Sequence, residues 1–161
     1  MTAGSATGES SERELVITRI FDAPRELVFR MWIEPQHLAR WGGPRGLAFS
    51  IIKMDARPGG AYRFNMKEGN GTDRWSQGVY REIVPPERLV FTTGWTDAEG
   101  TPTSPETLLT LTFEEYEGKT KLTLHQTGFE SVTSRDSHRE GYLSTLERLE
   151  EYLARSEPRR I

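Results

Sequence analysis

The hydrophobic period of this chain changes near residue 44, and no other feature restricts its fold as strongly. Residues 24–41 repeat apolar side chains at helical spacing and include Pro24 and Pro35, which suit the first turns of two short helices. Beyond residue 44, apolar and polar residues alternate with a period of two, as in strands that bury one face. The alternating segments are 47–56, 61–67, 74–84, 88–95, 107–116 and 119–129.

Short turns rich in Gly, Pro and Asn separate most of these segments. They are too short for a crossover helix, so neighbouring strands should be antiparallel. Residues 14–21, with the sequence ELVITRIF, are mostly β-branched and aromatic and predict one more strand before the helices. The link at residues 96–106 is longer, polar and rich in proline, and we expect it to be mobile.

The last segment predicts a long amphipathic helix. Thr133–Asp136 matches a capping box, and charged residues such as Arg148 fall away from the apolar face, where they should meet solvent. The apolar face itself consists of His138, Tyr142, Leu146, Leu149 and Leu153. A seven-stranded antiparallel sheet with one apolar face needs a cover, and this helix supplies it. We therefore predict an α+β fold in which a curved sheet wraps around the C-terminal helix and leaves a hollow between them.

A chain of 161 residues suits a single domain. Residues 1–11 consist mainly of small and polar residues that cannot bury enough surface to stay ordered. We expect a disordered N-terminal tail at 1–11, one folded domain at 12–155 and a C-terminal tail at 156–161.

Composition excludes several classes of function. The chain has no cysteine, so disulfides, iron–sulfur clusters and thiol nucleophiles are excluded, and its net charge of −3 argues against nucleic-acid binding. No signal peptide and no apolar run of roughly 18 residues is present, which favours a cytoplasmic protein without a membrane partner. The three histidines lack metal-ligand spacing, and no phosphate-binding loop or nucleophile elbow occurs. We expect neither a metal nor another cofactor.

Aromatic and methionine side chains mark a candidate ligand site on the predicted strands. Tyr62, Phe64 and Met66 share one face of their strand, and Phe91 and Trp95 share one face of another. Trp41 and Phe49 flank the bend after the short helices. Such side chains suit a pocket for a flat apolar ligand, although most aromatic residues in a small domain simply form the core.

The apolar face of the last helix adds His138, Gly141 and Tyr142 to this candidate site. An imidazole and a phenol in an apolar cavity could orient a carbonyl or hydroxyl group of a ligand. The alternative for His138 is a structural histidine bonded to a backbone carbonyl. Gly141 costs the helix about 1 kcal/mol relative to alanine, which indicates that space is needed there for a ligand or for close contact with a strand.

Seven segments, in the order in which they occur here, resemble the AHSA1-like family (activator of Hsp90 ATPase homologue 1-like) of the START-like, or SRPBCC, superfamily. The segments that carry the resemblance are FDAPRELVFRMW (21–32), HLARWGGP (37–44), DARPGGAYRF (55–64), GVYREIVPPERLVFTTGW (78–95), LTLTFEE (109–115), LTLHQTGF (122–129) and HREGYLSTLERLEEYL (138–153). The resemblance implies a helix-grip fold, also called START-like or Bet v 1-like, that encloses a largely apolar cavity. The chain departs from the family at Gly42, where a second tryptophan is frequent, and at Tyr142, where tryptophan follows the helix glycine.

The sequence leaves three functions open. The first is non-covalent binding or transport of a hydrophobic or aromatic small molecule, which needs only the fold and the aromatic lining. The second, implied by the resemblance, is a co-chaperone-like or stress-response role with Hsp90 as partner, although proven activators carry a further domain for that chaperone. The third is a polyketide cyclase-like enzyme that uses His138 or Tyr142 in acid–base chemistry. The exposed edges of an incomplete barrel also leave a homodimer open.

Overall fold

In the computed structural model of the chain, residues 13–156 are described. Their elements are β1 (Leu15–Phe21), α2 (Arg25–Ile33), α3 (Pro35–Trp41), β2 (Ala48–Met54), β3 (Ala61–Lys67), β4 (Asp73–Val84), β5 (Arg88–Thr96), β6 (Thr107–Tyr116), β7 (Lys119–Thr127) and α4 (Val132–Ser156). The tail predicted at 1–11 lies outside the described residues, as does the tail at 156–161 apart from residue 156, which ends α4.

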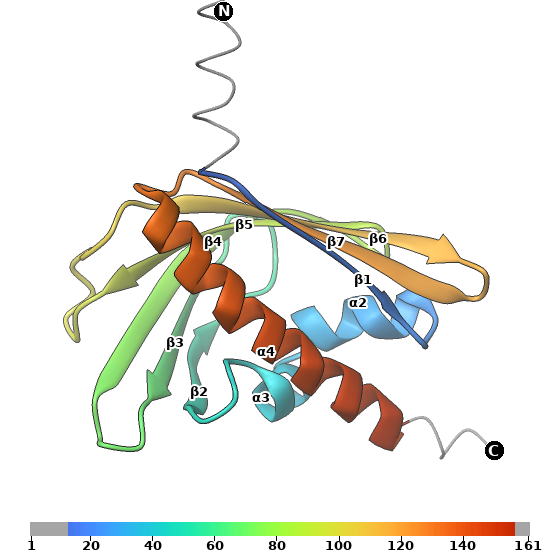
Figure 1. Cartoon of the computed structure of the whole chain (residues 1–161), viewed down its shortest axis with the longest axis horizontal. Helices are drawn as coiled ribbons and strands as arrows, with labels where there is room; N and C mark the ends of the chain where they lie inside the picture. The colour runs from blue at the N-terminus through green and yellow to red at the C-terminus, as the bar shows by residue number, and fades with distance from the viewer. Residues whose placement is uncertain (1–12, 157–161) are drawn as a thin grey trace, which may run out of the picture.

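The strands form one seven-stranded sheet in the order β1-β7-β6-β5-β4-β3-β2. Every neighbouring pair is antiparallel, which the short turns predicted for the strands that they join. From β2 to β7 each strand pairs with the next in the chain, and the last strand, β7, also pairs with the first, β1. Figure 1 shows the sheet curving around α4, with α2 and α3 on the same side of the sheet. The predicted helix-grip fold is confirmed.

The two halves of the concave face are filled differently. Under β1, β7 and β6 the space is packed with apolar side chains from the strands, from α2 and from the C-terminal half of α4. Phe29 of α2 meets Phe113 of β6 edge to face, with ring centroids 5.1 Å apart, and Leu149 of α4 is fully buried. The N-terminal half of α4 instead lies over β3, β4 and β5, where a hollow remains.

Helix α4 begins earlier than predicted. The hydroxyl of Ser131 accepts the backbone N–H of Ser134 at 3.0 Å, so Ser131 caps the helix and the capping box predicted at Thr133–Asp136 is wrong. The physical reason is that the segment holds several hydroxyl residues able to cap a helix, and sequence spacing alone does not decide which of them leaves the helical conformation.

The link at residues 96–106 is held by hydrogen bonds along its length. The Asp97 carboxylate accepts the backbone N–H groups of Glu99 at 3.0 Å and Thr101 at 2.9 Å. Arg63, on β3, donates to the carbonyl oxygens of Asp97 and Ala98 at 3.1 and 3.0 Å. These contacts give the link a defined path beside the hollow, while its mobility stays a prediction.

Candidate functional site

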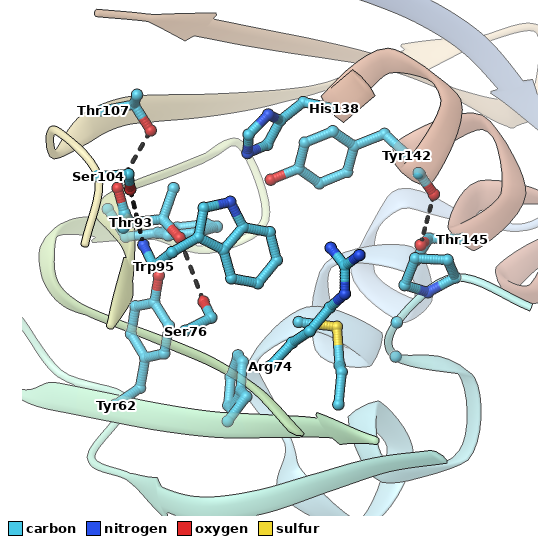
Figure 2. Close-up of a pocket in the computed structure, with 18 of the residues that line it drawn as sticks. Tyr62, Arg74, Ser76, Thr93, Trp95, Ser104, Thr107, His138, Tyr142 and Thr145 are labelled. Atoms are coloured by element: carbon cyan, nitrogen blue, oxygen red, sulfur yellow. Dashed lines mark hydrogen bonds between the residues drawn. The ribbon is translucent and has the colours of Figure 1, made fainter. Parts of the chain in front are cut away.

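A cavity of about 290 Å³ lies between the N-terminal half of α4, strands β3–β5 and the segment that follows α3 (Figure 2). All residues predicted for the ligand site line it. They are Trp41 at the end of α3, Phe49 on β2, Tyr62, Phe64 and Met66 on β3, Phe91 and Trp95 on β5, and His138, Gly141 and Tyr142 on α4. The sequence therefore identified the walls of this cavity, and ligand binding there stays a prediction.

The floor of the cavity follows from the register of the strands. Phe64 lies opposite Ser76 and Met66 lies opposite Arg74 in the β3–β4 pair, while Ser76 lies opposite Trp95 in the β4–β5 pair. Residues directly opposite each other on antiparallel strands project to the same face of a sheet. The three strands thus present alternating aromatic, apolar and polar side chains to the same space.

Four aromatic rings of this floor pack against one another. The Tyr62 ring lies 4.7 Å from Phe64, 5.5 Å from Tyr80 and 5.7 Å from Phe91, measured between centroids. The Tyr62–Phe91 contact is edge to face, the geometry that the charge distribution of aromatic rings favours. These mutually packed rings make a rigid apolar wall.

The Tyr62 hydroxyl keeps a polar partner inside that wall. It donates to the backbone carbonyl of Thr92 at 2.7 Å. The approach depends on Gly78, because a Cβ atom there would lie 1.8 Å from the Thr92 oxygen and 2.8 Å from the Tyr62 hydroxyl. Burial raises the pKa of Tyr62, Tyr80 and Tyr142 well above the ordinary value. Their phenols therefore stay protonated at neutral pH and act as hydrogen-bond donors rather than bases.

His138 and Tyr142 form the roof of the cavity. Figure 2 shows their side chains next to each other on α4, on the side that faces Trp95. The Nδ1 atom of His138 lies 2.9 Å from the carbonyl oxygen of Ser134, and because a carbonyl only accepts, Nδ1 carries the proton. A neutral His138 then has Nε2 as its acceptor. The sequence left two alternatives for His138, a bond to a backbone carbonyl or a place in the cavity wall. The structure has both.

Gly141 of α4 and the Gly42–Pro44 segment form one side wall of the cavity. A Cβ atom on Gly141 would meet a single neighbour, the Cγ atom of Pro44 at 3.6 Å, so no strand approaches this glycine closely. Arg148 holds the segment against α4 by donating from Nη1 to the carbonyl oxygens of Gly42 at 2.7 Å and Gly43 at 2.8 Å. The prediction that Arg148 only faces solvent is therefore wrong, because the turn that precedes β2 folds back onto the helix.

Hydroxyl groups line the part of the cavity beside β5. The hydroxyls of Ser76 and Thr93 lie 3.4 Å apart, and Thr107 donates to the Thr93 carbonyl at 3.1 Å. Sequence reasoning missed all three residues as cavity residues, because serine and threonine are common on strands whatever they face. Ser76 does share strand alternation with Tyr80, and that parity is the signal that could have found it.

The remaining histidines lie away from the cavity lining. His37 has its Nδ1 atom 2.8 Å from the Tyr152 hydroxyl, and His125 has Nε2 2.8 Å from a Glu14 carboxylate oxygen on the outer face of the sheet. Within residues 13–156 no group of three or more His, Asp or Glu side chains is arranged to hold a metal ion. In the same range, no helix combines the length and the apolar character needed to cross a bilayer.

The sequence profile described as activator of Hsp90 ATPase homolog 1-like protein matches residues 22–154. The chain belongs to this family. No curated protein sequence matches this chain. Among solved structures, a Chromobacterium violaceum protein aligns with a TM-score of 0.79 and 27% identity over 86% of this chain and 95% of its own. The AHSA1 protein from Silicibacter pomeroyi aligns with a TM-score of 0.79 and 26% identity over 89% of this chain and 99% of its own. An Arthrobacter aurescens protein aligns with a TM-score of 0.82 and 25% identity over 91% of this chain and 88% of its own.

Two charged residues of this AHSA1-like chain, Arg74 and Glu130, line the cavity without having been predicted there. Arg74 lies near the start of β4 and has a side chain that is 52% exposed, so the cavity reaches the surface beside it. Its Nε atom donates to a Glu68 carboxylate oxygen at 2.6 Å. Strand alternation places Arg74 on the same face as Ser76 and Tyr80, and this shared face is the sequence signal from which its position could have been predicted.

Proposed function

We propose that the chain binds a flat hydrophobic or aromatic small molecule, without covalent chemistry, in the cavity between β3–β5 and α4. The observation that carries this proposal is a cavity of about 290 Å³, open to the surface beside Arg74 and walled mainly by aromatic and apolar side chains. A cavity of about 150 Å³ admits benzene, and small-molecule pockets span roughly 300–1,000 Å³. The volume therefore suits a ligand of two or three rings.

The walls supply both affinity and orientation for such a ligand. Removing apolar surface from water contributes about 25 cal/mol per Å², and the rings of Phe64, Phe91 and Trp95 offer faces and edges for aromatic contact. The Tyr142 hydroxyl supplies a donor, and the bond of His138 Nδ1 to the Ser134 carbonyl leaves Nε2 available to a ligand. A few polar groups within an apolar pocket are typical of sites that bind one small molecule in one orientation.

The experiment is a fluorescence titration with N-phenyl-1-naphthylamine, a neutral three-ring probe that brightens in apolar surroundings. We expect the wild-type protein to bind it and Gly141→Leu to weaken binding by about tenfold, because the leucine side chain extends past Pro44 into the cavity. Gly141→Ala is the matched control, since its single added methyl makes only an ordinary contact with Pro44 at 3.6 Å. The alanine variant should keep affinity within about twofold and gain up to about 1 kcal/mol in free energy of unfolding.

Both variants must be shown to fold by circular dichroism before their affinities are compared. Equal affinity of the wild type and Gly141→Leu would place the probe outside this cavity and overturn the proposal. Failure of the wild-type protein to bind the probe at all would do the same.

A further inference from the structure

We infer that the ligand is an organic anion: a flat apolar body carrying a carboxylate that pairs with Arg74 at the mouth of the cavity. This inference rests on the proposed function and adds the chemical class of the ligand to it. Its basis is a single arginine that projects from the apolar floor of the sheet.

Arg74 belongs to the inner face of β4. It lies directly opposite Met66 of β3, whose side chain is part of the cavity lining, and two residues before Ser76, which is also part of it. Figure 2 shows the Arg74 guanidinium rising from β4 toward the space between Trp95 and Thr145. A charged side chain on the concave face of a sheet is uncommon because that face is normally reserved for the core.

The hydrogen bonds of Arg74 leave its end free for a ligand. Nε donates to Glu68, which fixes the guanidinium without using its outer edge. Neither terminal nitrogen, Nη1 or Nη2, has a hydrogen-bond partner among the residues that the structure describes. Two parallel N–H groups at that edge match the two oxygens of a carboxylate, a pairing that the planar fork of arginine favours.

Apart from Glu68, no carboxylate among the described residues pairs with Arg74, so the other charges at this end of the cavity do not compete with a ligand anion for it. Lys67 and Asp73, the neighbours of Arg74 at the β3–β4 hairpin, pair with each other at 2.6 Å. Glu130 is the other fully charged residue in the described lining, and it lies in the loop before α4. The helix rises roughly 15 Å between its start, just after Glu130, and Tyr142. Figure 2 shows Arg74 pointing toward the Thr145 side of this stretch, so Glu130 and Arg74 mark different ends of the site. The carboxylate of the ligand would therefore pair with Arg74, and its apolar body would contact the rings of β3 and β5.

The test is displacement of N-phenyl-1-naphthylamine by two competitors of nearly the same shape, 2-naphthoate and 2-naphthamide. The first is ionised at pH 7 and the second is neutral. We expect the acid to displace the probe from the wild-type protein at a concentration about fivefold below that of the amide, as suits a half-exposed ion pair. Arg74→Gln should abolish this ratio, and 0.5 M salt should reduce it in the wild type.

Arg81→Gln is the matched control. Arg81 lies on the same strand, is exposed and is not part of the cavity lining, so its loss changes the net charge equally while the acid-to-amide ratio should stay near its wild-type value. The ratio is measured within each variant, so any loss of packing by the shortened side chain cancels. Equal displacement by acid and amide in the wild type, or equal loss of the ratio in both variants, overturns the inference and leaves the cavity proposal standing. Absence of probe binding in the wild type overturns both.

Discussion

At the scale of single residues, the cavity depends on polar atoms that are satisfied within an apolar wall. The Tyr62 hydroxyl reaches the Thr92 carbonyl because Gly78 has no side chain in the way. A buried hydroxyl without a partner would cost about 1–3 kcal/mol, so the glycine and the tyrosine act together. The same burial keeps the phenolic proton in place.

Alkaline pH should therefore destabilise the protein through Tyr62. Because burial raises the pKa of Tyr62 above its ordinary value of 10.0, the folded protein holds this proton after the unfolded chain has lost it. Its contribution to stability is complete below pH 10 and is lost as the pH rises above that value. We expect the free energy of unfolding, measured in urea at pH 8 and pH 11, to fall less in Tyr62→Phe than in the wild type.

The control for this measurement is Tyr116→Phe, since the Tyr116 side chain is 47% exposed on β6. That variant should lose stability between the two pH values as the wild type does. An identical fall in all three proteins would show that the Tyr62 phenol does not couple folding to pH.

At the scale of elements, α4 performs two tasks along its length. Its C-terminal half packs Leu146, Leu149 and Leu153 into the filled part of the sheet, and its N-terminal half covers the cavity. Arg148 lies between them and ties the helix to the carbonyls of Gly42 and Gly43. The cavity wall after α3 is thus positioned by the helix itself.

Removing this tie should affect both stability and binding. We expect Arg148→Met to lower the free energy of unfolding by about 1–3 kcal/mol, because three carbonyl groups, those of Arg40, Gly42 and Gly43, lose a charged donor. The released segment should also weaken binding of N-phenyl-1-naphthylamine by a measurable factor. Arg155→Met, at an exposed position of the same helix, should change neither quantity appreciably. Equal behaviour of the two variants in urea denaturation and probe titration would contradict the role assigned to Arg148.

The elements themselves could largely be predicted from sequence, because their signals are local. Strand alternation between Gly- and Pro-rich turns located β2 to β7 to within a few residues, and the stripe from His138 to Leu153 located α4. The start of α4 was misplaced because several hydroxyl residues compete to cap it. The role of Arg148 could not be predicted, since its carbonyl partners come from a turn about a hundred residues earlier.

At the scale of the whole molecule, the sheet is filled on one half and hollow on the other. Under β1, β7 and β6 large side chains from two helices meet the sheet, whereas over β3–β5 Gly141 of α4 leaves space. The aromatic residues of the site could be predicted from parity on each strand. Arg74 and Ser76 share strand parity with Tyr80, but they were missed because polar residues are common on strands whatever they face. The strand register adds that their face is the cavity floor.

The most direct measurement is a crystal structure of the wild-type protein with N-phenyl-1-naphthylamine bound. We expect density for the fused rings between α4 and β3–β5, in contact with Trp95 and Tyr142, with the sheet otherwise unchanged. A structure in which the probe sits on the outer face of the sheet, or in which side chains fill the space beneath Tyr142, would contradict it.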